Sequence, residues 1–274
     1  MKLSCLPVSF FADILAQRMS VADWARMGKE IGLDAIDLSI LFVPDRSLRT
    51  AALLRRQIEA EGMSVAMLTS YPDFTHPDPA QRRVELELAE ETTAIAAELG
   101  AKMLRVTAGQ AHPEISRQDG IAWAVEGLSS LVDRTRACGV SLVYENHAKP
   151  GVWTYTDFSQ PPDIFLEIFH ATSGAGLGVN FDVGNASAFS EDPLGLLTWV
   201  LPRLVSVHAS DTALKGELRH VLLGTGVTPY PLLFGCLKQN GWDGWICMEE
   251  ASNLGKIGVE TAAQFIRKTW AKAR

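Results

Sequence analysis

The chain has 274 residues, of which 47% are apolar and 21% are charged, a composition typical of globular proteins with a large core. The net charge of −7 disfavours nucleic acid as a partner, because an acidic surface repels phosphate backbones. No run of about 18 uncharged apolar residues is present, so we expect no contact with a membrane, and the four scattered cysteines indicate reduced thiols in a cytoplasmic protein.

Short apolar runs alternate with longer amphipathic segments along the chain. Eight runs have the length and composition of buried strands: Leu3–Val8, Ala35–Ile40, Ser64–Ser70, Lys102–Ala108, Ser141–His147, Leu177–Val183, Leu204–Ser210 and Trp245–Ala251. Between them, helical patterns cover Val21–Ile31, Arg46–Glu61, Pro79–Leu99, Arg117–Cys138, Pro161–Ala171, Pro193–Val200 and Tyr230–Gln239. Such alternation implies parallel strands joined by right-handed crossovers.

The repeated strand–helix unit predicts an α/β fold, a (β/α)₈ barrel made by one domain over residues 1–274. Glycines that end helices in a left-handed conformation follow five of the segments, at positions 32, 62, 100, 139 and 241. An open doubly wound sheet is the competing architecture. It predicts a glycine-rich loop after the first strand, and the segment 7–10 is not such a loop.

The last four predicted strands each end in a carboxylate or an imidazole, namely Glu145, Asp182, His208 and Glu249. In a barrel these strand ends meet at the mouth. Three carboxylates and one imidazole suit a divalent cation such as Mn²⁺, Mg²⁺, Co²⁺ or Zn²⁺, and burying them without a cation is costly. Alternation turns only one of two adjacent glutamates inward; we choose Glu249, with Glu250 as its rival.

Six further residues are candidates for substrate binding: His147, Lys149, Trp153, Arg105, Asn185 and His220. Arg105 lies in an otherwise apolar strand, so it either pairs with an acid in the barrel or faces an anionic substrate. Asn185 either bonds the substrate or caps the next segment, and His220 either reaches the metal region or lies in a surface loop. Asp211 is a candidate for orienting His208 or Lys215.

The chain resembles the xylose-isomerase-like barrel superfamily of sugar isomerases and epimerases over nearly its whole length. Within that superfamily, the sequence motifs of the chain are similar to those of the D-tagatose 3-epimerase, hydroxypyruvate isomerase and inosose dehydratase groups. The motifs that carry the resemblance are Glu145-Asn146, Asp182-Val-Gly-Asn185, His208-Ala-Ser-Asp211, His220-Val-Leu-Leu-Gly224-Thr-Gly226 and Gly241-Trp-Asp-Gly-Trp-Ile-Cys-Met-Glu249.

The resemblance places the family's metal ligands on Glu145, Asp182, His208 and Glu249. It implies one divalent ion, with Mn²⁺ as the first choice, and a small sugar or polyol-derived substrate bound by a homodimer or tetramer. It also implies an isomerase or epimerase in which the metal polarises a carbonyl and stabilises an enediolate. Glu145 and Glu249 would then be the catalytic pair, one removing a proton from carbon and the other returning one.

Two departures separate the chain from the apurinic endonuclease branch. That branch has a histidine three residues after the Asp of the sixth strand and an aspartate two residues before the position of His220. This chain has Asn185 and Leu218 there, so a three-zinc cluster lacks ligands. Two functions besides isomerisation stay open: a metal-dependent dehydratase of the inosose or dehydroshikimate type, with His147 or His220 as the acid, and a non-catalytic sugar-binding barrel.

Overall fold

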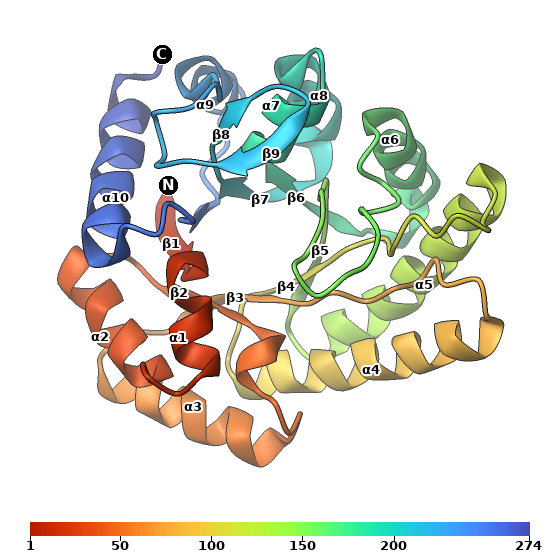
Figure 1. The fold of residues 1–274 in the computed structure, drawn as a ribbon, viewed down its shortest axis with the longest axis horizontal. Coiled ribbons are helices and arrows are strands. Elements are labelled where there is room, and N and C mark those ends of the chain that lie inside the picture. The colour runs from red at the N-terminus through yellow and green to blue at the C-terminus, as the bar shows by residue number, and fades with distance from the viewer.

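A computed structural model describes all 274 residues, and it confirms the α/β barrel expected from the sequence (Figure 1). Eight parallel strands form one sheet: β1 (Lys2–Leu6), β2 (Ile36–Ser39), β3 (Val65–Thr69), β4 (Met103–Val106), β5 (Ser141–Glu145), β6 (Gly178–Asp182), β7 (Leu204–Ala209) and β10 (Trp245–Glu249). Each lies within one of the eight runs or extends one residue before it. The alternating pattern therefore located every strand of the barrel.

Helices surround the sheet (Figure 1). They are α1 (Phe11–Leu15), α2 (Val21–Ile31), α3 (Leu48–Ala60), α4 (Pro79–Glu98), α5 (Arg117–Ala137), α6 (Pro162–Ala171), α7 (Val183–Phe189), α8 (Pro193–Val200), α9 (Tyr230–Gln239) and α10 (Gly255–Lys272). Short 3₁₀ helices cover Val8–Phe10, Ile40–Phe42, Ser173–Ala175 and Leu201–Arg203. The sequence did not predict α1, α7 or α10, although α10 buries an amphipathic stripe that includes Val259, Ala262 and Ile266. None of the helices has the length and apolar composition that a membrane crossing requires.

Local signals explain where the helices begin and end. Ser20 and Asp23 form a reciprocal capping box at the start of α2, which satisfies backbone groups that the helix leaves free. The five glycines expected to end helices all have positive φ, from +67° at Gly241 to +78° at Gly32. These stops set the short connections that return the chain to the sheet.

The barrel is nearly closed, because β1 and β2 end the order of hydrogen-bonded strands without pairing with each other. Side chains join this seam. The backbone N–H of Leu3 donates to Asp34 at 2.8 Å, and the hydroxyl of Ser4 donates to Asp37 at 2.7 Å inside the barrel. Side-chain bonds thus replace the missing part of the ladder.

The barrel interior changes from apolar to polar toward the mouth. Met103, Val143 and Cys247 belong to a small apolar cluster inside the sheet. Two residues further along their strands, alternation puts polar residues on the same face, among them Arg105 and Glu145. A second, unpredicted feature is the antiparallel hairpin of β8 (Thr212–Leu214) and β9 (Glu217–His220), which follows β7.

Candidate metal centre and active site

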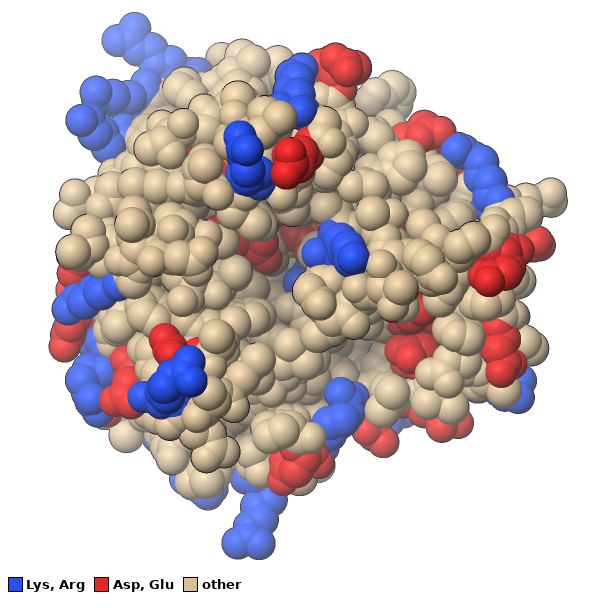
Figure 2. Space-filling model, in the orientation of Figure 1, with Lys and Arg blue, Asp and Glu red and all other residues tan.

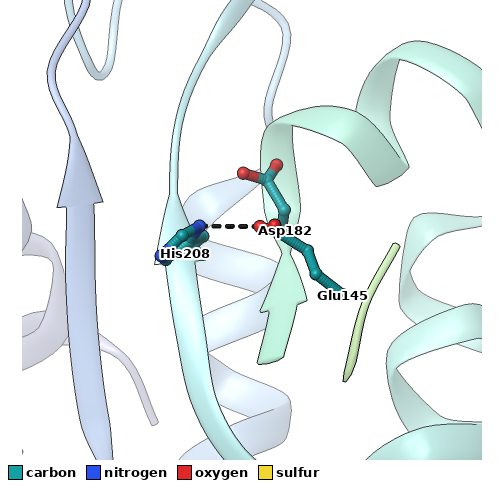
Figure 3. A group of neighbouring side chains, drawn as sticks. All are labelled: Glu145, Asp182 and His208. Carbon is teal, nitrogen blue, oxygen red and sulfur yellow. Dashed lines mark ion pairs between the residues drawn. The ribbon is translucent and has the colours of Figure 1, made fainter. Parts of the chain in front are cut away.

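Three of the four predicted metal ligands meet at the ends of neighbouring strands. Glu145, Asp182 and His208 are fully buried at the ends of β5, β6 and β7, and their ligand atoms lie within 4.8 Å of one another. Figure 3 shows the ion pair between Glu145 and His208, with the Asp182 carboxylate at the end of β6 beside it. The strand ends therefore bring together the group that the spacing predicted.

Glu145 has a different partner on each of its carboxylate oxygens. Its Oε1 atom lies 2.6 Å from Nδ1 of His208 and accepts a 3.0 Å hydrogen bond from Nδ2 of Asn180. Its Oε2 atom lies 2.9 Å from Nε of Arg105. The hydroxyl of Ser206 donates to Oδ1 of Asn180 at 2.7 Å, which fixes the orientation of that amide. The carboxylate of Glu145 is thus held from both sides.

Glu249 joins this group through His208, since its Oε1 atom lies 3.1 Å from the same Nδ1. Its side chain is 13% exposed, whereas those of Glu145 and His208 are completely enclosed. Glu250 points away, where it accepts hydrogen bonds from the Ser9 hydroxyl at 2.6 Å and from the backbone N–H of Ser252 at 2.9 Å. Of the two adjacent glutamates, Glu249 is the one that faces the barrel mouth.

Asp182 sits at the junction of β6 and α7. Its Oδ1 atom accepts from the backbone N–H of Asn185 at 2.6 Å, which caps α7, and from the hydroxyl of Ser210 at 2.9 Å. The Asn146 side chain bonds both backbone groups of Asp182, donating to its carbonyl and accepting from its N–H. A Cβ at Gly184 would lie 2.8 Å from the Ser210 backbone, so only glycine permits this close approach.

The electrostatics of the site depend on two cations among several carboxylates. Burial alone would raise the pKa of Glu145, but the charges of His208 and Arg105 outweigh it and hold that pKa below its usual range. Burial and the carboxylates of Glu249 and Glu145 raise the pKa of Asp182 well above its usual range. Burial would lower the pKa of His208, yet the two glutamates raise it. The excess of negative groups around one imidazole fits a divalent cation.

The loop between β5 and α6 carries three of the predicted substrate-binding residues. Lys149 is exposed, Trp153 is buried, and His147 is half-buried with no partner for its Nδ1 atom. Burial lowers the pKa of His147 to about 4. Figure 2 shows a hollow near the middle of the face that is turned toward the viewer, with acidic side chains inside the hollow and basic ones at its edge. The loop thus contributes polar groups beside the strand ends.

The loop is fastened to its neighbours by Gln110. The Oε1 atom of Gln110 accepts from the backbone N–H groups of Thr154 at 2.9 Å and Tyr155 at 3.1 Å. Its Nε2 atom donates to Asp73 at 2.9 Å, and Asp73 also lies 2.8 Å from Nε2 of His112. One side chain therefore connects the loops that follow β3, β4 and β5.

The remaining predicted residues differ in how far their contacts match the expected roles. Arg105 takes the first of its two roles, pairing with Glu145. Asn185 lies in the first turn of α7 with Oδ1 unpartnered, and His220 lies on β9 with Nδ1 unpartnered. The expectation that Asp211 orients His208 or Lys215 was wrong. Its carboxylate instead accepts hydrogen bonds from the backbone N–H groups of residues 212, 224, 226 and 228. Asp211 therefore organises the loop that these residues form.

Sequence reasoning missed the side chains that hold the strand-end residues. Asn180 and Ser210 lie two positions from Asp182 and His208, and Met67 places its sulfur 3.2 Å from Nε2 of His208. Alternation along a strand puts residues two apart on one face, so Asn180 could have been found from its spacing. No local signal marks Met67, because its contact comes from a strand on the other side of the barrel.

Comparisons with known proteins agree with this architecture. The sequence profile of the family described as "Xylose isomerase-like TIM barrel" matches residues 25–269. The chain is 21% identical to the L-ribulose-5-phosphate 3-epimerase UlaE of Shigella boydii serotype 18, over 98% of this chain and 95% of that protein.

Two solved structures share the fold. The D-psicose 3-epimerase of Clostridium cellulolyticum H10, crystallised with D-tagatose, superposes with a TM-score of 0.77 at 15% identity, over 98% of this chain and 99% of that one. The probable 3-DHS dehydratase AsbF of Bacillus anthracis superposes with a TM-score of 0.75 at 16% identity, over 97% and 99%.

Proposed function

Because this chain belongs to the xylose isomerase-like TIM barrel family, we propose that it is a metal-dependent sugar isomerase or epimerase that moves a proton next to a carbonyl. The observation that carries the proposal is the pair of carboxylates, Glu145 and Glu249, which lie 2.6 Å and 3.1 Å from one nitrogen of His208. The similarity to an L-ribulose-5-phosphate 3-epimerase along almost the whole chain supports the same reaction class.

Glu145, Asp182, His208 and Glu249 would hold one divalent ion, with Mn²⁺ as the first choice. Their donor set of carboxylates and an imidazole suits that ion, and the close spacing of three of their ligand atoms supports one shared centre. Such an ion supplies Lewis-acid polarisation of a substrate carbonyl. Ser210 and Asn180 orient two of the holding carboxylates through their hydrogen bonds.

The protein residues then carry the proton. A carboxylate that is ionised at neutral pH can accept a proton from the carbon beside a carbonyl. The pKa values of both Glu145 and Glu249 lie below their usual range, since the charge of His208 outweighs the effect of burial. One glutamate removes the proton. Return of a proton by the other glutamate to the opposite face of the same carbon inverts that carbon. Return to the neighbouring carbon, with the hydroxyl proton passing to the former carbonyl oxygen, shifts the carbonyl.

Solvent exchange tests the proposal directly. Metal-loaded protein is incubated in D₂O with D-tagatose, D-fructose, D-psicose and L-ribulose 5-phosphate, and deuterium at carbon is followed by NMR together with the sugar products. We expect exchange with at least one ketose, accompanied by its epimer or isomer, and its loss after chelation. Binding of every ketose without exchange at carbon would instead support a sugar-binding barrel.

A dehydratase reaction at this site needs an acid that protonates the departing hydroxyl. His147 lies near the site, but its pKa of about 4 leaves it neutral at pH 7, with little tendency to donate a proton. The low pKa disfavours His147 as that acid, which leaves His220 as the candidate acid for elimination. Elimination would produce a conjugated carbonyl, so ultraviolet absorbance during the same incubations distinguishes the two reactions.

A further inference from the structure

Arg105 is a charged side chain enclosed within the barrel. It lies on β4 with 1% of its surface exposed, and its Nε atom is 2.9 Å from Oε2 of Glu145. Its Nη1 atom donates to the carbonyl of Ser70 at 2.9 Å, and its guanidinium lies 4.8 Å from the centre of the Tyr71 ring. Both ends of the guanidinium are therefore fixed by the protein, and little of it is left for a substrate.

The contacts of Glu145 have no counterpart at Glu249. Arg105 engages one oxygen of Glu145 and Asn180 engages the other. Glu249 contacts only His208 among these groups, and part of its side chain reaches solvent. Two glutamates that flank one imidazole are thus held in different ways, Glu145 by three side chains and Glu249 by His208 alone.

We propose that Arg105 is a positioning residue for Glu145, which turns Oε1 toward His208 and the cation site while holding Oε2 against the barrel wall. This inference rests on the proposed function, because it assigns Arg105 a part in the same reaction. The guanidinium fork suits the task, since it can contact Glu145 and the Ser70 carbonyl together; an ammonium group has no such fixed geometry.

The ion pair also stabilises the buried charge of Glu145, together with the contact between Glu145 and His208. A buried carboxylate that loses its partner is strongly destabilising. Removing Arg105 should therefore destabilise the cation-free protein, and a bound cation should then stabilise the variant more than the wild type. Removing a positive charge near the site should tighten cation binding, whereas the disorder of Glu145 should slow turnover.

The test compares Arg105→Met and Arg105→Lys with the control Arg203→Met. Arg203 is a partly buried arginine that bonds the carbonyl of Phe169 at the other end of the barrel. Melting temperatures are measured after EDTA treatment and with 1 mM MnCl₂. Mn²⁺ affinity comes from calorimetry, and kcat and KM come from deuterium exchange with the ketose that the wild type accepts.

For Arg105→Met we expect a cation-free melting temperature about 5–10 °C lower, with more of the loss recovered by Mn²⁺ than in Arg203→Met. The Mn²⁺ affinity should become tighter, because a cation that stabilises the variant more than the wild type binds it more tightly. The kcat should fall at least about 100-fold with KM within about threefold. Arg105→Lys should recover part of the melting temperature but not the turnover.

Three results would overturn the inference: an unchanged melting temperature and kcat in Arg105→Met, full turnover in Arg105→Lys, or a higher KM at unchanged kcat, which would make Arg105 a substrate-binding residue. If Arg105→Met does not fold, Asn180→Leu removes the hydrogen bond to the other oxygen of Glu145 and should lower kcat in the same way. A wild type without exchange on any ketose would contradict the proposed function, while the melting and Mn²⁺ measurements would still decide the role of Arg105.

Discussion

The two halves of the barrel use the same alternation of inward and outward residues for different purposes. In the half formed by β5, β6, β7 and β10, the acids and the imidazole stand at the strand ends. In the half formed by β1 to β4, the strand ends carry Ser39 and Thr69, and the acid Asp37 lies two residues deeper. Burial raises the pKa of Asp37 to about 7, whereas the pKa of Glu145 is held low. Depth and neighbouring charge, more than residue type, decide how readily each of these acids ionises at neutral pH.

The largest expected effect is at Glu249, in the half of the barrel formed by β5, β6, β7 and β10. Replacing this residue by Gln keeps its shape and removes the carboxylate that faces the mouth. We expect kcat for deuterium exchange to fall about 10³-fold, the usual contribution of a general base. Glu250→Gln is the matched control, because Glu250 bonds Ser9 and Ser252 and not His208. Equal losses in the two variants would contradict the assignment of Glu249.

The second prediction concerns how much Mn²⁺ stabilises the folded protein, and whether Asp182 is needed for that stabilisation. Mn²⁺ at about 100 times its Kd should stabilise the wild type by about 2.7 kcal/mol, or about 5–10 °C in melting temperature. Asp182→Asn should bind Mn²⁺ at least about 100-fold more weakly and lose most of this response. The cation-free variant should melt no lower than the wild type, because it lacks one of the mutually repelling carboxylates. A full Mn²⁺ response in Asp182→Asn would exclude this residue as a ligand.

The sequence predicted the strand-end residues better than the side chains that hold them. Strand ends on consecutive units are visible in a one-dimensional pattern, so Glu145, Asp182 and His208 could be placed together from that pattern alone. The partners that hold them come from contacts across the barrel. Arg105 was recognised as unusual because a charge interrupted an apolar strand, but its choice of Glu145 depended on the register between β4 and β5. The contact of Met67 with His208 spans the interior and has no sequence signal.

The third prediction concerns Asp37, in the half of the barrel formed by β1 to β4. Its pKa is raised from 3.8 to about 7, chiefly by burial, so between pH 4 and pH 7 the native state holds a proton that the unfolded state has lost. Stability should therefore fall as pH rises through this window and level off above it. Asp37→Asn cannot titrate and should gain about 3 kcal/mol relative to the wild type between pH 4.5 and pH 8.

Urea unfolding at these two pH values measures the difference. Ser4→Ala is the companion variant, because it removes the hydroxyl that donates to Asp37 and leaves the carboxyl in place. It should keep a pH dependence at least as steep as that of the wild type. A difference between Asp37→Asn and the wild type that does not change with pH would show that Asp37 does not titrate in this window.

The smallest expected effect lies where the two halves are joined. Gln110 follows β4, and its amide connects Asp73 with the backbone of Thr154 and Tyr155 in the loop after β5. Gln110→Ala removes these bonds without altering any strand end, so kcat should change little and KM should rise about three- to fivefold. Hydrogen exchange should quicken at residues 153–156, which would show the loop loosening on the timescale that exchange reports. A fall in kcat at constant KM would instead mean that Gln110, like Arg105 on β4, helps to position the reacting groups.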